Sequence, residues 1–111
     1  MGIVNKLSVE WTEPQSKKVY NLKLQFQYAE TWLYEYKIGD ALKWGDNKYD
    51  EGDKTAKEVL IEAIVENEDL LKEVPEDFEI LIKDNIITDA WPLEDKKKYF
   101  NLDNHFIILK K

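Results

Sequence analysis

The chain has 111 residues, 43% of them hydrophobic and 35% charged, with a formal net charge of −7 at pH 7. This length and composition predict one globular domain, residues 1–111, that needs no covalent cross-links. The absence of cysteine excludes disulfides, thiolate metal sites and cysteine nucleophiles, and the absence of arginine together with the negative charge argues against nucleic-acid binding.

Two strands are predicted before residue 30. Leu7, Val9 and Trp11 alternate with polar residues, which is the period of a strand with one buried face. Residues 13–16 contain a proline among polar side chains and predict a turn. The next strand has the clearest alternation in the chain, with its apolar face formed by Tyr20, Leu22, Leu24, Phe26 and Tyr28.

The following stretch is rich in aromatic residues and predicts a partner strand. Its apolar side chains alternate at Trp32, Tyr34, Tyr36 and Ile38. We expect the aromatic rings of this strand to enter the core, because aromatics at strand period usually pack there. Residues 45–53 form a polar loop, and Trp44 and Tyr49 at its edge are the aromatics that we expect to be most exposed.

Residues 55–66 fit two patterns. At helical period the apolar stripe consists of Ala56, Val59, Leu60, Ala63 and Ile64, and at strand period the buried face consists of Val59, Ile61, Ala63 and Val65. The β-branched content favours a strand, but the pattern alone leaves helix and strand open. Residues 67–74 predict a short helix that ends before Pro75.

The C-terminal third predicts three more strands. Residues 78–82 and 86–91 alternate on either side of Asp84-Asn85, a two-residue hairpin turn. A short helical turn over 93–100 and a last strand over 105–109 follow. The predicted fold is mainly β: a single antiparallel sheet or sandwich-like domain of six or seven strands with one short helix. The alternative is an α+β fold with a helix at 55–74.

Several short motifs lie between residues 31 and 91: Tyr36-Lys37-Ile38-Gly39-Asp40, Trp44-Gly45-Asp46-Asn47, Gly52, Lys57-Glu58-Val59 and the run from Phe78 to Ile87. With these motifs the chain resembles a group of small bacterial β-rich proteins for which no activity is defined. The resemblance implies a strand at 58–66. A zinc-ribbon-like hairpin with a CxxC pair often follows in that group, but this chain has Glu68-Asp69-Leu70-Leu71 there, so a zinc role is not implied. Some such small acidic bacterial proteins look like immunity partners of toxins.

Candidates for catalysis and metal binding are few. His105 is the only histidine, and with two serines in the chain no catalytic triad can be argued from spacing. Residues 47–58 have a glycine and a glutamate at the spacing of an EF-hand loop. However, Tyr49 and Lys54 stand where that loop needs a carboxylate and an apolar residue, so we interpret it as a turn. We therefore predict no enzymatic activity, no cofactor and no metal site.

Acidic residues are concentrated between residues 50 and 79. Twelve of them accompany three lysines, which gives a charge of −9, while the rest of the chain sums to +2. Such a segment can be a solvated surface, but a focused negative field also accelerates association with a basic protein. The predicted partner-binding residues are Glu62, Glu66, Glu68, Asp69, Glu73 and Asp77, with Trp44 and Tyr49 as aromatic anchors.

The sequence thus predicts a small acidic binding protein that occludes a basic partner, such as an immunity or inhibitor protein for a bacterial toxin. No apolar run is long enough to span a membrane and no secretory leader is present, so we expect a cytoplasmic location. Two alternatives stay open. One is a β module that binds a small polar or carbohydrate ligand through exposed aromatics, and the other is an assembly or scaffold component that associates through a strand edge.

Overall fold

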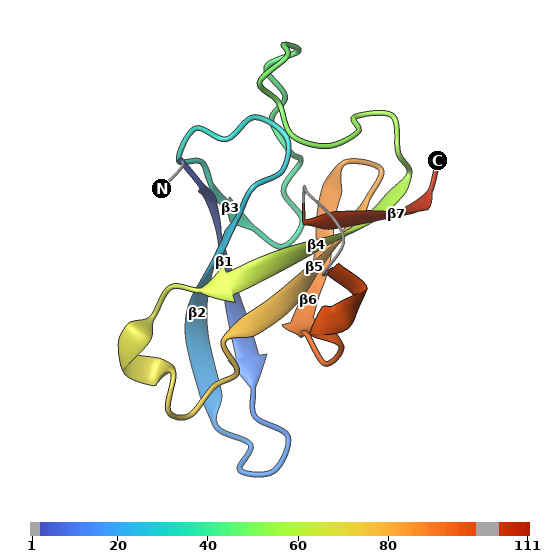
Figure 1. The fold of residues 1–111 in the computed structure, drawn as a ribbon. Coiled ribbons are helices and arrows are strands. Elements are labelled where there is room, and N and C mark those ends of the chain that lie inside the picture. The colour runs from blue at the N-terminus through green and yellow to red at the C-terminus, as the bar shows by residue number, and fades with distance from the viewer. Residues whose placement is uncertain (1–2, 100–104) are drawn as a thin grey trace.

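The computed structural model describes residues 3–99 and 105–111 of the chain. The mainly β fold predicted from the sequence is confirmed (Figure 1). In chain order the elements are β1 (Asn5–Thr12), β2 (Val19–Phe26), β3 (Glu35–Lys37), β4 (Glu58–Val65), the 3-10 helix η1 (Glu68–Leu70), β5 (Asp77–Lys83), β6 (Ile86–Pro92), the 3-10 helix η2 (Lys96–Tyr99) and β7 (Phe106–Lys110).

All seven strands belong to one sheet, in the order β3-β1-β2-β4-β5-β6, and β7 pairs with β4. The pairs are antiparallel with one exception, since β3 runs parallel to β1. The antiparallel sheet predicted from the sequence thus contains one parallel pair, between β1 and β3. Within the described residues, no helix is long and apolar enough to cross a membrane.

The sheet curls until its two ends meet. After β3 the chain turns at Gly39, whose amide donates to the Ile87 carbonyl on β6 at 2.7 Å. The Ile87 amide in turn donates to the Asp40 carbonyl at 2.9 Å, and an antiparallel bridge joins Ala41 to Ile86. Residues 39–41 therefore connect the β3 end of the sheet to β6, so that the edge of β6 is paired at Ile86 and Ile87.

The core fills the inside of the curled sheet, and β4 shows how it is built. Alternate residues of β4 are buried there, namely Val59, Ile61, Ala63 and Val65. A helix over this segment would have placed Leu60 and Ile64 in the core, but Leu60 is half-buried and Ile64 is 48% exposed. The alternative of a helix at 55–74 is wrong, because the apolar residues match the period of a strand that has neighbours on both sides.

The two predicted helical turns are short. Residues 68–70 form η1, so the predicted helix over 67–74 is a single 3-10 turn. Residues 96–99 form η2, and the buried carboxylate of Glu79, on the outer face of β5, connects this turn to the sheet. Glu79 accepts a hydrogen bond from the Tyr99 hydroxyl at 2.7 Å and another from Trp91 Nε1 at 3.1 Å. Burial and the neighbouring Glu79 raise the pKa of Tyr99 far above its usual value.

The hairpin between β5 and β6 has the turn that the sequence predicts. Asp84 and Asn85 both adopt left-handed backbone angles, with φ of 50° and 63°, as a two-residue type I′ turn requires. The Asn85 side chain donates to the Lys54 carbonyl at 3.0 Å and accepts from Trp44 Nε1 at 3.2 Å. The turn is thereby connected to the long loop between β3 and β4.

Candidate functional site

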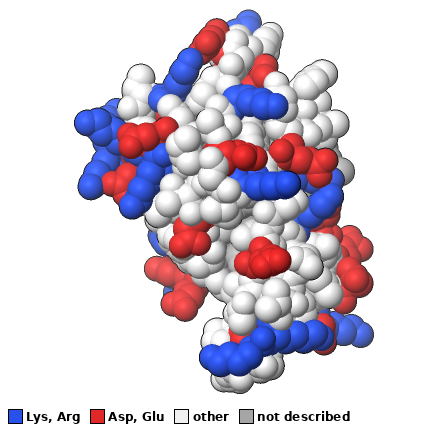
Figure 2. All heavy atoms as spheres, turned by 180° about the vertical axis from the view of Figure 1, so that it is seen from behind, with Lys and Arg blue, Asp and Glu red and all other residues white. Residues whose placement is uncertain are grey.

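Half of the acidic residues between 50 and 79 lie beside basic side chains from outside that segment, five lysines and one histidine. Six of the twelve lie within 4.0 Å of a lysine or histidine nitrogen: Glu58 with Lys110, Glu62 with His105, Glu66 with Lys6, Glu73 with Lys18, Asp77 with Lys96 and Glu79 with Lys98. The face shown in Figure 2 accordingly carries acidic and basic side chains interspersed. The fold therefore balances much of the charge that the sequence concentrates in this segment.

The acidic residues predicted to bind a partner differ in how freely they face solvent. Glu66 lies 2.6 Å from Lys6 Nζ and accepts from Gln25 Nε2 at 2.9 Å, and these two partners lower the pKa of Glu66. Glu62 lies 2.8 Å from His105 Nδ1. Glu68 and Asp69, by contrast, are exposed on η1.

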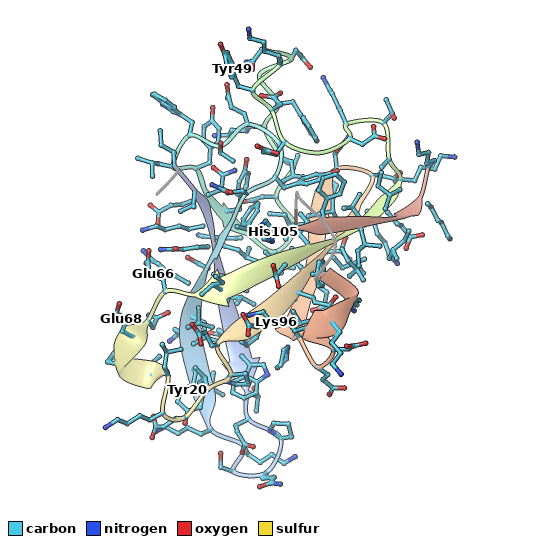
Figure 3. All side chains as sticks on the ribbon, in the orientation of Figure 1. Tyr20, Tyr49, Glu66, Glu68, Lys96 and His105 are labelled. Atoms are coloured by element: carbon cyan, nitrogen blue, oxygen red, sulfur yellow. The ribbon has the colours of Figure 1, made fainter. Side chains whose placement is uncertain are left out.

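The predicted aromatic anchors lie far from those carboxylates. Figure 3 shows Tyr49 at one end of the molecule, and Glu66 and Glu68 at its side, where β4 leads into η1. Tyr49 is 75% exposed. Trp44 is half-buried, because its ring packs edge-on against Tyr28 with centroids 5.5 Å apart. The predicted set therefore does not form one contiguous surface.

A buried asparagine organises the end of the molecule where Tyr49 lies. Asn5 is fully buried at the start of β1. Its Nδ2 donates to the carbonyls of Tyr28 and Glu30 at 3.3 and 2.9 Å, and its Oδ1 accepts from the amides of Trp32 and Tyr34, each at 3.2 Å. One side chain thus satisfies four backbone groups of the turn that leads into β3.

This turn projects Trp32 and Leu33 out of the fold. Trp32 is 66% exposed and Leu33 is 64% exposed, and Leu33 has the left-handed φ of 59° that bulky residues rarely adopt. The expectation that Trp32 belongs to the core is wrong. The Asn5 bonds fold the chain into a turn here, so only residues 35–37 of the predicted strand pair with β1.

The exposed tryptophan borders a hollow of about 460 Å3, which we call the aromatic hollow. It is lined by Ile3, Glu30, Thr31, Trp32, Asn47, Tyr49 and Asp50. Apolar side chains from three separate segments meet there with polar side chains. Three of the seven lining residues are apolar or aromatic and four are polar or charged, so exposed apolar surface lies beside hydrogen-bonding and charged groups. Exposed aromatic side chains in such surroundings are typical of binding surfaces.

The two carboxylates of the aromatic hollow approach each other beside Gly45. A Cβ atom on Gly45 would lie 2.5 Å from Glu30 Oε2 and 3.1 Å from Asp50 Oδ1, so the glycine leaves the space that both carboxylates use. Asp50 Oδ2 accepts from the amides of Gly45 and Asp46 at 2.8 and 2.9 Å. Glu30 Oε1 accepts from the Tyr34 hydroxyl, and this bond raises the pKa of Tyr34. Both carboxylates are therefore fixed in place by hydrogen bonds.

Cations already contact the aromatic rings around the hollow. Lys48 Nζ lies 5.2 Å from the centroid of the Tyr49 ring, and Lys43 Nζ lies 4.5 Å from that of Tyr34. These are cation–π distances, and they show that the rings are placed where a positive charge can reach their faces. The Tyr49 ring can thus contact an ammonium or guanidinium group of a partner, which would take the place of Lys48.

Sequence reasoning missed Asn5, Ile3 and Glu30. One signal was available for Asn5, because it shares the buried face of β1 with Leu7, Val9 and Trp11, where a polar residue needs hydrogen-bond partners. No comparable signal marks Ile3 or Glu30, which the fold of the turn brings to the hollow.

No protein-family model, no curated protein and no solved structure matches the chain. The resemblance of residues 31–91 to small bacterial proteins therefore stays a prediction.

Proposed function

We propose that this protein is a non-catalytic binding module that docks a cationic protein partner in the aromatic hollow. Trp32 and Tyr49 are the anchors, and Glu30 and Asp50 receive a lysine or arginine of the partner. The observation that carries the proposal is the exposed Trp32, which the buried side chain of Asn5 holds outside the core.

The aromatic hollow has the composition of an interface centre. Tryptophan and tyrosine dominate binding energy at protein interfaces because they bury a large area with few rotatable bonds. Here they stand beside two fixed carboxylates and the exposed Ile3. A partner lysine or arginine can lay its apolar stem on the rings and place its charge near the carboxylates.

The acidic segment 50–79 plays a secondary part in this proposal. Its carboxylates with internal cation partners contribute little to affinity, since breaking those pairs would offset the gain. Exposed carboxylates such as Glu68 and Asp69 increase the rate of encounter with a basic partner instead. An immunity or inhibitor protein that occludes a basic toxin is one function that needs this combination.

Fluorine NMR of protein labelled with 5-fluorotryptophan tests the proposal. The four tryptophans give separate reporters, and the Trp32 resonance is assigned with W32F. At low salt we expect a tetralysine peptide to shift the Trp32 resonance and a tetraglutamate peptide to leave it unchanged. The conservative double variant E30Q/D50N keeps the hydrogen-bond acceptors and should weaken the tetralysine response at least about fivefold.

A carbohydrate ligand is the second candidate, because Trp32 lies beside the amide of Asn47 and the hydroxyl of Thr31 in the aromatic hollow. A panel of neutral oligosaccharides added to the same labelled protein separates the two functions. A Trp32 shift with an oligosaccharide and none with tetralysine would replace the proposed function by sugar binding.

A further inference from the structure

A second surface lies where the curled sheet stays open, between β1 and β6. Residues 35–41 fill only part of the seam between these strands. They run down along β1 as far as the Ser8–Lys37 pair, turn at Gly39 and return along β6 at Ile87 and Ile86. Among residues 3–99 and 105–111, no strand pairs with this side of β1 beyond Ser8.

The backbone of β1 faces the open seam with unused hydrogen-bonding groups. The Lys6 amide donates to the Tyr34 carbonyl at 2.9 Å, so Lys6 directs its backbone groups toward β3. Alternate residues of a strand direct these groups to the same side. Glu10 and Thr12 therefore point their amides and carbonyls into the seam, where β3 no longer reaches them.

The β6 side of the seam is protected against strand pairing. The Ala90 amide is satisfied by the carboxylate of its neighbour Asp89, whose Oδ1 lies 2.8 Å away. Pro92 has no amide hydrogen. Such devices are typical of strand edges that avoid pairing. Over Val9–Thr12, β1 has no proline and no amide bonded to a neighbouring carboxylate, so it is the edge that can accept an added strand.

A hollow of about 710 Å3 begins at this edge and extends across β1 to β2. Val9, Glu10, Lys37, Ile38, Asp89 and Ala90 line its part at the edge, and Asn21, Leu22, Lys23 and Asn67 line the rest. Its volume is within the range of about 300–1,000 Å3 that is usual for ligand sites. At the end of the hollow nearest β3, Ser8 pairs with Lys37 on one side and with Lys23 on the other. Cross-strand neighbours have Cβ atoms about 5 Å apart, so the two lysines flank a small serine.

We propose that this seam binds an extended peptide with a free C-terminal carboxylate, added antiparallel to β1. Antiparallel pairing directs the peptide from Thr12 toward Ser8, so that its C-terminus arrives at the Lys37–Ser8–Lys23 row. The backbone groups of Glu10 and Thr12 supply the strand hydrogen bonds. The Lys37 ammonium group and the Ser8 hydroxyl receive the carboxylate, while the Lys23 ammonium group is paired with Glu35 at 3.1 Å. This surface is separate from the aromatic hollow and does not depend on the function proposed for it.

Amide NMR of the full chain tests this inference with two matched probes. One is a pool of N-acetylated tetrapeptides of random sequence with free carboxylates, and the other is the same pool with amidated C-termini. We expect the free-acid pool to shift the amide signals of Glu10 and Thr12 and the amidated pool to act at least about threefold more weakly. K37Q should weaken the response to the free-acid pool by a similar factor, and K72Q, at an exposed lysine outside the seam, should leave it unchanged.

A second variant tests the strand pairing itself. Glu10→Pro removes the amide that points into the seam and should abolish the shift at Thr12. If this variant does not fold, the comparison of K37Q with K72Q decides the question. Equal responses to both pools, equal responses of K37Q and K72Q, or unshifted Glu10 and Thr12 amides would each overturn the inference.

Discussion

At the scale of single residues, Asn5 has the largest structural consequence. Asn5 has an amide side chain on a face of β1 that is otherwise apolar, and this side chain makes four hydrogen bonds to the turn before β3. The exposure of Trp32 and the position of Glu30 both follow from those bonds. A buried asparagine that does not itself line the aromatic hollow thus determines the geometry of the hollow.

Asn5→Ala should lower the free energy of unfolding by more than about 2 kcal/mol, because four backbone groups of the turn, in one buried and three partly buried hydrogen bonds, lose their partner. Urea unfolding followed by circular dichroism measures the change. Asn21→Ala is the matched control, since Asn21 is exposed on β2. Equal stabilities of the two variants would show that Asn5 does not hold the turn.

Glu66 provides a test of pH dependence. Lys6 and Gln25 lower its pKa in the folded protein, so its ionised form stabilises the fold. This contribution is fully present above the unfolded pKa of about 4.3 and is lost as the pH falls through the lower folded pKa. The wild-type protein should therefore exceed E66Q in stability at pH 6–7 and lose that advantage in acid. A difference that stays constant down to acid pH would contradict the assignment.

At the scale of elements, the long loop between β3 and β4 depends on one close approach. Gly52 has a φ of 97°, and a Cβ atom there would lie 2.1 Å from the buried ring of Tyr28. Gly39 has nearly the same φ of 98° but nothing within 4 Å of such an atom. A Cβ atom added at Gly39 would therefore cause backbone strain alone, and one added at Gly52 would cause backbone strain and a steric clash.

Gly52→Ala should destabilise the protein by about 2 kcal/mol more than Gly39→Ala does, because only the first variant overpacks the core. Thermal unfolding of both variants measures the difference. Equal losses of stability would mean that the loop moves away from Tyr28 without cost.

The strands were predictable where one face is buried and the other is solvated. The alternation in β1, β2, β5 and β6 placed them, and Asp84-Asn85 identified the turn between the last two. The alternation of Trp32 with Tyr34 failed because hydrogen bonds to Asn5, distant in the sequence, override a local pattern. The parallel pairing of β3 has no local signal, since it depends on how the sheet curls.

At the scale of the whole molecule, the fold redistributes the charge that the sequence concentrates. Five lysines and His105 come from outside residues 50–79 to pair with six of its acids. Sequence alone could not predict this, because each pair joins segments that are distant in the chain. Because of this pairing, the proposed binding site is the aromatic hollow and not the acidic segment. Of the residues that line the hollow, only Tyr49 was predicted from the sequence as a binding residue.

The affinity of the protein for a tetralysine peptide, measured by calorimetry at low salt, tests this central claim most directly. Two double variants are compared: W32A/Y49A removes the anchors of the aromatic hollow, and E68Q/D69N removes two exposed charges of the acidic segment. We predict that W32A/Y49A weakens binding about tenfold, as hot-spot residues do, and that E68Q/D69N weakens it less than about threefold. A larger loss of affinity in E68Q/D69N than in W32A/Y49A would contradict the proposal and return the binding site to the acidic segment.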